Sequence, residues 1–304
     1  MLTATDEKTA ETIRRDIRLL ALDADGTVLD RSGHVRVATR RAIRAAQQRG
    51  VRVVLATGRL HSSAARVAAE AGMDEPVISC NGAAAGSLKH PPQMWWRDPL
   101  EADDLRRLVA VLEEYRCSYE LYVLDHMYTS RRSLSLRAFW GWTRPQVRHA
   151  WRTLRRIWQD LHLVGLRPFS EWPATPEELP EKVMVTHPNG RRLDEVRLAL
   201  TEMFPDRLET ARTGEHFLEI TRAGISKGSG LARLASTLGI RPEQVMAIGD
   251  QGNDLPMLRW AGLGVAMGHA PDYVREAADA VTLSNDRDGV AAAIQRFILD
   301  DVVP

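Results

Sequence analysis

Short apolar runs alternate with amphipathic stretches in the first third of the chain. Apolar runs over 19–22, 51–57 and 76–80 stop at polar residues or glycine, which is typical of buried parallel strands that open into loops. Apolar residues at helical spacing fill the intervals over 35–50 and 61–71. Strands that alternate with helices predict a parallel sheet with right-handed crossovers.

The same alternation of strands and helices is predicted in the last third of the chain. Strands are predicted over 244–250, 263–267 and 280–283, and helices over 226–239, 254–262 and 288–299. The two ends of the chain are therefore expected to form one α/β unit, a Rossmann-like doubly wound parallel sheet.

The middle of the chain has a different pattern. Its expected elements are strands over 121–124, 182–188 and 216–220 and helices over 100–115 and 192–204. Prolines and tryptophans cluster between them. This pattern predicts an α+β cap domain inserted into a loop of the α/β core.

These patterns divide the chain into an extension, a core and a cap. The expected parts are a flexible extension over 1–16, an α/β core over 17–87 and 223–304, and a cap over 88–222. Glycine tolerates backbone change, so we expect the hinges between core and cap near Gly86 and Gly224.

Charge and composition narrow the classes of function. The 41 basic residues nearly cancel the 40 acidic ones, and a net charge of +1 argues against a whole-chain polyanion binder. Cys80 and Cys117 are too few for a disulfide framework or a four-thiolate zinc site. No apolar run reaches about 18 residues, and the N-terminus lacks the apolar core of a signal peptide. We expect a soluble cytoplasmic protein with no membrane or nucleic-acid partner.

Four short polar segments occupy equivalent places beside the predicted elements. DADGT, ATGR and GDQGND each follow an apolar strand, and SKG opens a helix. Ligands bind at the carboxyl ends of the strands in an open parallel sheet, so these segments should converge on one edge. Their side chains of interest are Asp23, Asp25, Thr57, Lys227, Asp250 and Asp254.

Each segment alone also has a simpler interpretation. An aspartate before glycine commonly forms a turn, ATGR is typical of a strand-to-helix turn, and GDQGND can be a polar loop or an imperfect calcium loop. The four segments together, in this order and on these elements, favour one shared site.

Several carboxylates in one cleft predict a bound cation. Close like charges repel by about 4 kcal/mol near a protein surface, and Mg²⁺ accepts a few carboxylates together with water and substrate phosphate. Backbone amides at Gly58 and at the helix start around Lys227 add donors for phosphate oxygens. Metal, lysine, threonine hydroxyl and carboxylates together indicate phosphoryl transfer.

These segments resemble the haloacid dehalogenase-like hydrolase superfamily, in particular its Cof-type phosphatases with a large type II cap. LLALDADGTVLD is similar to the first family motif, VVLATGR to the second, ISKG to the third and MAIGDQGNDLPML to the fourth. The similarity covers about 17–86 and 217–299, whereas 88–216 resembles the family only loosely.

The resemblance implies a role for each matching residue. Asp23 matches the nucleophile that becomes a phospho-aspartate, and Asp25 matches the acid/base that protonates the leaving oxygen and later activates water. Mg²⁺ would be held by Asp23, by the backbone carbonyl of Asp25 and by Asp250. Asp254 would act through water or by orienting Lys227.

The same resemblance implies a phosphate-binding set. Thr57 and Lys227 would bind the transferring phosphoryl group, with Gly58 beside them and Asn253 supporting the same side. His269 stands where the family usually carries asparagine, so its effect on substrate preference stays open.

Three more residues lie in or near the first two motifs. Ala24 replaces a larger apolar residue between the two aspartates, which should only loosen packing. His34 and Arg59 lie close in sequence to these motifs, and either can touch substrate. Neither is expected to have a catalytic role.

A basic and aromatic segment lies inside the predicted cap. Residues 131–160 contain eight arginines, four tryptophans and one acidic residue. Three interpretations stay open: a packed cap helix with solvated arginines, a lid that attracts anionic substrate, and a docking surface for nucleic acid or an anionic membrane.

The expected function is a Mg²⁺-dependent phosphatase of small phosphorylated metabolites, such as sugar phosphates or similar phosphomonoesters. A phosphomutase or a dedicated sugar-phosphate phosphatase of the same superfamily is an alternative, because these enzymes differ in cap contacts. A polyanion-binding protein that uses the arginine- and tryptophan-rich segment is an alternative of another class.

Overall fold

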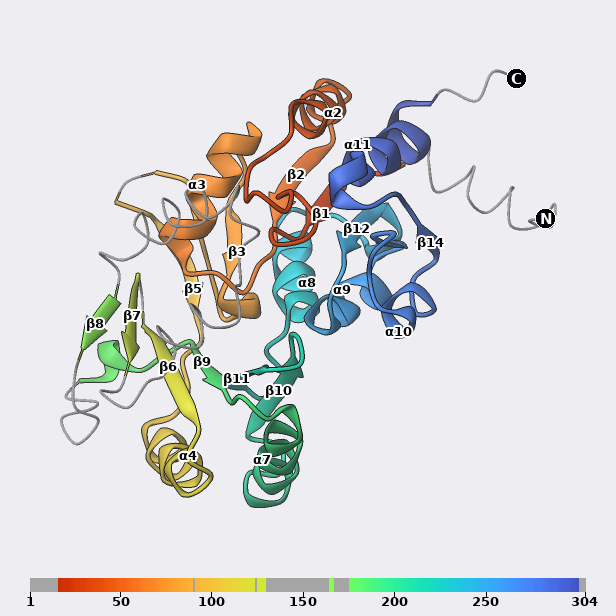
Figure 1. Ribbon diagram of the computed structural model, residues 1–304. Helices are drawn as coiled ribbons and strands as arrows, with labels where there is room; N and C mark the ends of the chain where they lie inside the picture. The colour runs from red at the N-terminus through yellow and green to blue at the C-terminus, as the bar shows by residue number, and fades with distance from the viewer. Residues whose placement is uncertain (1–15, 90, 124, 130–163, 167–174, 301–304) are drawn as a thin grey trace.

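The computed structural model describes residues 16–89, 91–123, 125–129, 164–166 and 175–300. These residues form a core lobe and a smaller cap lobe (Figure 1). The predicted extension, except Asp16, and the basic and aromatic segment 131–160 lie outside the described residues. Within the described ranges, no helix is long and apolar enough to cross a membrane.

A five-stranded parallel sheet forms the centre of the core. Its order is β14 (Ala280–Val281), β13 (Leu263–Ala266), β12 (Val245–Gly249), β1 (Leu19–Leu22) and β2 (Arg52–Leu55). At the carboxyl end of β1, Leu22 lies opposite Ile248 of β12 and Leu55 of β2. The polar residues that follow these three strands therefore emerge at the same edge of the sheet.

Helices cover both faces of this sheet. One layer contains α2 (Val37–Gln48), α3 (His61–Ala71) and α11 (Gly289–Ile294); the other contains α8 (Lys227–Thr237), α9 (Leu255–Trp260) and α10 (Asp272–Arg275). Leu20 and Leu22 pack into the first layer, and Leu19 and Ala21 pack into the second. Burial on both faces explains the unbroken apolar run of β1 and confirms the predicted doubly wound core.

A three-stranded antiparallel sheet stands beside the core. It contains β3 (Val77–Ser79), β4 (Ala84–Gly86) and β5 (Met94–Arg97), and a parallel bridge between Ala56 and Ile78 joins it to the end of β2. Trp96 of β5 packs with Ile78 and Leu231, and its indole nitrogen donates to the Gly82 carbonyl at 3.0 Å. β5 therefore packs against the core, although it falls inside the predicted cap range 88–222; that domain division stays a prediction.

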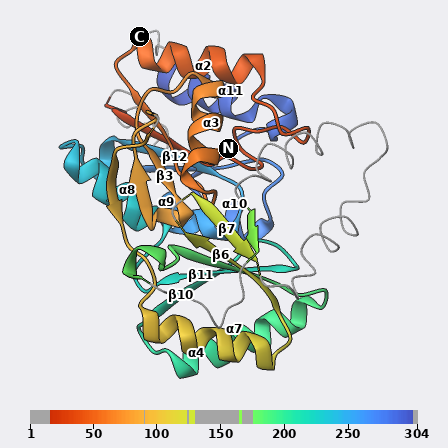
Figure 2. The same cartoon turned by 90° about the vertical axis from the view of Figure 1, so that its left-hand side faces the viewer.

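The cap is built on a six-stranded sheet. Its order is β10 (Leu208–Arg212), β11 (Phe217–Arg222), β9 (Lys182–Thr186), β6 (Ser118–Val123), β7 (His126–Thr129) and β8 (Val164–Leu166). Helices α4 (Ala102–Glu114) and α7 (Gly190–Met203) cover the face turned away from the core (Figure 2). Val183 and Val185 of β9 pack toward these helices, so the alternating residues Lys182 and Met184 point to the face that meets the core.

Several short elements complete the structure. They are the 3₁₀ turns η1 (Cys80–Gly82), η3 (Pro176–Glu178), η4 (Pro242–Gln244), η5 (Gly252–Asp254) and η6 (Asn285–Arg287) and the π-helical end η7 (Gln295–Leu299). Five strands were not predicted: β4, β5, β7, β8 and β10. They are short or mix polar and aromatic residues, so their apolar alternation is too weak to distinguish them from loops.

Candidate active site

The loop after β1 brings two aspartates to the edge of the sheet. Asp23 is buried, whereas the Asp25 side chain is 59% exposed. The chain turns at Gly26 with φ +84°, and a Cβ there would collide with the Asp250 carboxylate. Glycine thus provides both the left-handed turn and the close approach between the first and fourth motif loops.

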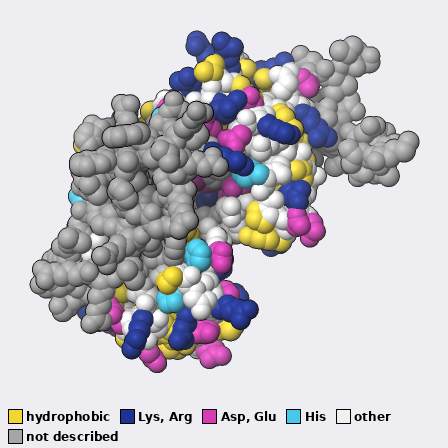
Figure 3. Space-filling view, in the orientation of Figure 1, with side chains coloured by type: hydrophobic (Ala, Val, Ile, Leu, Met, Phe, Trp, Pro, Cys, Tyr) yellow, Lys and Arg dark blue, Asp and Glu magenta, His cyan; other side chains and the backbone are white. Residues whose placement is uncertain are grey.

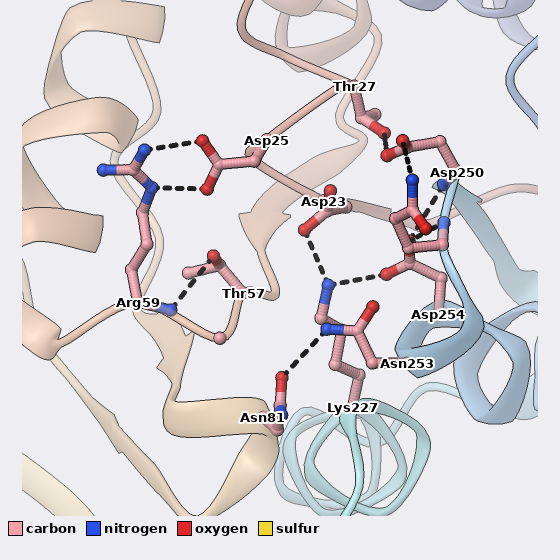
Figure 4. Close-up of polar contacts among 12 residues, drawn as sticks. Asp23, Asp25, Thr27, Thr57, Arg59, Asn81, Lys227, Asp250, Asn253 and Asp254 are labelled. Atoms are coloured by element: carbon pink, nitrogen blue, oxygen red, sulfur yellow. Dashed lines mark hydrogen bonds and ion pairs between the residues drawn. The ribbon is translucent and has the colours of Figure 1, made fainter. Parts of the chain in front are cut away.

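Lys227 connects these two loops from the start of α8. Its Nζ lies 2.6 Å from Asp23 Oδ1 and 2.6 Å from Asp254 Oδ1, and all three side chains are buried (Figure 4). Ser226 caps the helix by accepting from the Ser229 amide at 3.1 Å. The Ser226 amide in turn donates to the Ser229 hydroxyl at 2.9 Å. This reciprocal cap fixes the first turn of α8 and therefore the backbone position from which the Lys227 side chain extends.

The loop after β12 supplies the other two carboxylates. Asp254 accepts from the backbone amides of Asp250 and Gln251, both at 2.9 Å, with the oxygen that Lys227 does not use. Asp250 accepts from the Thr27 hydroxyl at 3.2 Å, and its other oxygen lies 3.5 Å from His269 Nε2. The structure thus places His269 next to a predicted metal ligand.

The acidic side chains fit a cation. Oxygens of Asp23, Asp250 and Asp254 lie within 4.8 Å of one another, and all three residues are buried. Burial raises the pKa of Asp23 well above its usual range, more than the Lys227 charge lowers it, and Asp254 and Asp250 raise it further. Asp254 already binds Lys227 and two amides, so Asp23 and Asp250 are the side chains that suit direct coordination of a hard cation such as Mg²⁺.

Asp25 is held apart from this carboxylate cluster by Arg59. The guanidinium contacts both Asp25 oxygens, at 2.7 Å from Nε and 2.6 Å from Nη2 (Figure 4). It also donates to the Ser63 hydroxyl at 3.0 Å. Burial lowers the pKa of Arg59, but the Asp25 charge and hydrogen bonds outweigh it and leave that pKa raised. A bidentate pair fixes both the direction and the ionised form of the carboxylate in this conformation. Sequence reasoning considered Arg59 only as a substrate contact and missed this pairing.

Thr57 and Gly58 form the turn after β2. The Thr57 amide donates to the Ile78 carbonyl at 2.9 Å, and its hydroxyl accepts from the Arg59 amide at 3.3 Å. A Cβ on Gly58 would lie 2.9 Å from Glu219 Oε1, so the cap approaches the turn too closely for another residue. Figure 4 shows Thr57 between the Asp25–Arg59 pair and Lys227.

Asn253 reaches its neighbours through its amide nitrogen. That nitrogen lies 3.2 Å from both Asn81 Oδ1 and Glu219 Oε2, while Asn253 Oδ1 is buried and has no partner in the described part of the chain. Both contacts point toward the cap side of the site, and direct phosphate contact by Asn253 stays a prediction. Asn81 and Glu219 were missed as site residues; the available signal for Asn81 was its place directly after an apolar strand.

The site lies at the meeting of the two lobes. On the face shown in Figure 3, acidic side chains gather on the core lobe with basic and histidine side chains beside them. Asp23, Asp250, Asp254 and Lys227 come together as predicted from the sheet topology, and Thr57 faces the same edge. The geometry fits a bound cation beside an anion.

Comparison with known proteins points to one family. The family model of haloacid dehalogenase-like hydrolases matches residues 20–294. The protein YxeH of Bacillus subtilis is 33% identical over 285 residues, 93% of this chain and 98% of its own. The 5-amino-6-(5-phospho-D-ribitylamino)uracil phosphatase YcsE of the same organism is 29% identical over 287 residues, 93% and 97% of the two chains. A solved haloacid dehalogenase-like hydrolase from B. subtilis superposes with a TM-score of 0.79 at 28% identity, covering 91% of this chain and 99% of the other.

Proposed function

This chain belongs to the haloacid dehalogenase-like hydrolase family, and we propose that it is a Mg²⁺-dependent phosphatase of small phosphorylated metabolites that works through a phospho-aspartate. The family match and the phosphatase among its relatives make it a phosphatase. The observation that carries the rest is the buried Lys227 bridge between Asp23 and Asp254, with Asp250 beside it.

Asp23 is the nucleophile in this proposal. One carboxylate oxygen attacks phosphorus, the bond to the leaving oxygen breaks, and the phosphoryl group is carried on Asp23. Lys227 lies 2.6 Å from Asp23 Oδ1, so its ammonium is placed to attract phosphoryl oxygens arriving at the same atom. Asp254 keeps that ammonium in position from its other side. Thr57 supplies a hydroxyl at the same edge.

Mg²⁺ would be held by Asp23 and Asp250 together with the backbone carbonyl of Asp25. When bound, it would supply positive charge that offsets the phosphate and keeps Asp23 ionised. The need for that charge is visible in the raised pKa of Asp23. Gly26 allows the Asp250 carboxylate to approach the first motif loop and so keeps the two ligand-bearing loops together.

Asp25 protonates the leaving oxygen and then removes a proton from the water that hydrolyses the phospho-aspartate. A general acid must carry a proton, whereas the bidentate contact with Arg59 favours the ionised form. Asp25 therefore leaves Arg59 and takes up a proton from solvent before it protonates the leaving oxygen. Its side chain is 59% exposed, which gives it the freedom to turn.

The substrate class rests on the relatives. YcsE is named for a phosphorylated ribitylamino-uracil, a small phosphomonoester. We therefore place sugar phosphates and similar phosphomonoesters first. A phosphomutase would use the same core chemistry and return the phosphoryl group to another hydroxyl. Polyanion binding by 131–160 concerns residues outside the described ranges.

A panel of phosphomonoesters tests the proposal. Phosphate release is measured with Mg²⁺, with excess chelator and with Ca²⁺, beside the Asp23→Asn variant as a blank. We expect turnover only with Mg²⁺, restoration after chelation when Mg²⁺ is added back, and inhibition by Ca²⁺, whose looser coordination misplaces the nucleophile. Equal turnover in excess chelator, or no turnover of any ester with Mg²⁺, would overturn the proposal. Transfer of phosphate to a second sugar hydroxyl without release would favour the mutase.

A further inference from the structure

A second buried lysine joins the cap to the core beside the phosphate-binding turn. Lys182 of β9 and Glu219 of β11 are 1% and 4% exposed. The Lys182 Nζ lies 2.6 Å from Glu219 Oε1 and also donates to the Gly58 carbonyl. The Tyr122 ring lies 4.2 Å from this ammonium and covers it from the cap side. Two cap strands thus place an ion pair directly against the Thr57–Gly58 turn.

The other oxygen of Glu219 binds two core side chains. Glu219 Oε2 accepts from Asn81 Nδ2 at 2.7 Å and from Asn253 Nδ2 at 3.2 Å. Burial alone would raise the pKa of Glu219, but the Lys182 charge and the Asn81 hydrogen bond outweigh it, so that pKa is lowered and the group stays ionised. One cap carboxylate therefore sets the direction of an amide from η1 and an amide from η5.

The turn is consequently held from two sides. The Asn81 backbone amide donates to the Thr57 carbonyl at 3.0 Å, while Lys182 binds the next carbonyl, that of Gly58. Asn81 has φ +58°, a conformation that asparagine tolerates better than most residues. Its side chain, turned to Glu219, links this strained position to the cap.

We propose that Lys182 and Glu219 are positioning residues that shape the phosphate-binding turn at Thr57–Gly58 when the cap is docked, which makes cap docking and phosphate binding one coupled event. This inference rests on the proposed function, because it assigns phosphate binding to that turn. The cap then contributes to the chemistry without touching the reacting atoms. Neither residue matches a motif that the family resemblance assigned.

A neighbouring ion pair provides a matched control. Glu181 precedes Lys182, is 1% exposed, and pairs with Arg97 of β5 at 2.5 Å. It has the same charge type and depth as Glu219, but its arginine partner comes from the strand beside the core. The Arg97 side chain is 23% exposed, so this pair is less deeply buried than Lys182–Glu219, but removing either pair leaves no single charge unmatched.

The experiment compares two double variants, Lys182→Gln/Glu219→Gln and Arg97→Gln/Glu181→Gln, with the wild-type protein. The dissociation constant of inorganic phosphate is measured by calorimetry with Mg²⁺ present, and KM and kcat are measured with an aryl phosphate. Hydrogen exchange of peptides that cover 57–60 and 80–83 reports on the turn itself.

For the Lys182/Glu219 variant we expect the phosphate dissociation constant and KM to rise by between about tenfold and a hundredfold. A shift of the hydrogen-bond donors at the Thr57–Gly58 turn would weaken their contacts with phosphate by about that factor. Hydrogen exchange of both peptides should become faster. The Arg97/Glu181 variant should change phosphate binding by no more than about twofold, as for independent sites.

Equal losses in both double variants would show a merely structural role and overturn the inference. Unchanged phosphate affinity in a folded Lys182/Glu219 variant, or wild-type protein that binds no phosphate, would overturn it too. If that variant does not fold, Lys182→Arg keeps the charge but alters the contact with Gly58, and unchanged phosphate affinity there is equally decisive against it. Wild-type protein that binds phosphate but hydrolyses no ester would contradict the proposed function and leave this test valid.

Discussion

Two lysines are buried in the described part of the chain, Lys227 in the core and Lys182 in the cap, and their roles differ. Lys227 in the core lies among three buried carboxylates, and Lys182 in the cap pairs with one. The pKa of Asp23 is raised by burial and by neighbouring acids, whereas the pKa of Glu219 is lowered because Lys182 and Asn81 outweigh its burial. The core cluster has an excess of negative charge that suits a cation, and the cap pair is already balanced.

This difference in charge balance distinguishes carboxylates that react from carboxylates that hold the structure in place. An unbalanced buried carboxylate is costly alone and becomes useful when a metal and a phosphate arrive. A balanced carboxylate with all its neighbours bonded holds a shape and needs no ligand. Burial and a nearby lysine therefore do not identify a catalytic carboxylate; the charge count around it does.

The largest effect should come from the nucleophile of the core cluster. Asp23→Asn should lower kcat by at least about 10³-fold, as expected for loss of a nucleophile, and no phosphoenzyme should form. Folding should be retained, because the change removes one of three crowded charges and Lys227 keeps Asp254. Rapid-quench labelling detects the phosphoenzyme, and thermal unfolding measures whether the variant is folded. Turnover above a few per cent of wild type would show that another group attacks phosphorus.

The next effect concerns the exposed aspartate of the same loop. Asp25→Asn should slow turnover by about 10²–10⁴-fold, the usual contribution of a general acid/base. The defect in the first step should shrink with a nitrophenolate leaving group, which needs little protonation. Burst kinetics with aryl phosphates of different leaving-group pKa measure this. An equal defect for every leaving group in the first step would contradict the acid role.

Removing one charge of the Lys182–Glu219 pair should lower the stability of the fold more than it lowers the rate of the chemical step. Glu219→Gln alone should reduce the free energy of unfolding by about 3–5 kcal/mol, because it leaves Lys182 buried without its counterion. Lys182→Gln/Glu219→Gln should lose less, since neither charge is left alone. Urea unfolding of both variants tests this. A single variant that is as stable as the double variant would show that Lys182 finds another counterion.

The smallest effect is on the pH dependence of stability. Glu219 has a folded-state pKa below its ordinary value of 4.5, so its stabilisation is fully present above about pH 4.5 and is lost as the pH falls through the lower folded-state pKa. The Lys182→Gln/Glu219→Gln variant should therefore lose less stability than wild type as the pH falls below about 4.5. Thermal melts across this range measure the slopes. Parallel slopes would mean that Glu219 does not titrate there.

The sequence determined the core by itself, because its signals are local. The apolar run of β1, the helical spacing of α2 and α3, and the polar residues directly after β1, β2 and β12 predicted the parallel sheet and the edge where Asp23, Thr57 and Asp250 meet. Parallel topology is enough for this, since the carboxyl ends of neighbouring strands must lie together. Lys227 followed from its place at a helix start.

Tertiary structure alone decided the partners of these residues. The Asp25–Arg59 pair spans 34 positions in sequence, and the Lys182–Glu219 pair joins strands separated by a helix and another strand. A buried lysine and a surface lysine have the same letter in the sequence, and only packing decides which one loses its water. Strands β9 and β11 turn Lys182 and Glu219 toward the core, while their apolar neighbours pack toward the cap helices. Apolar periodicity predicted both strands but not the role of their polar face.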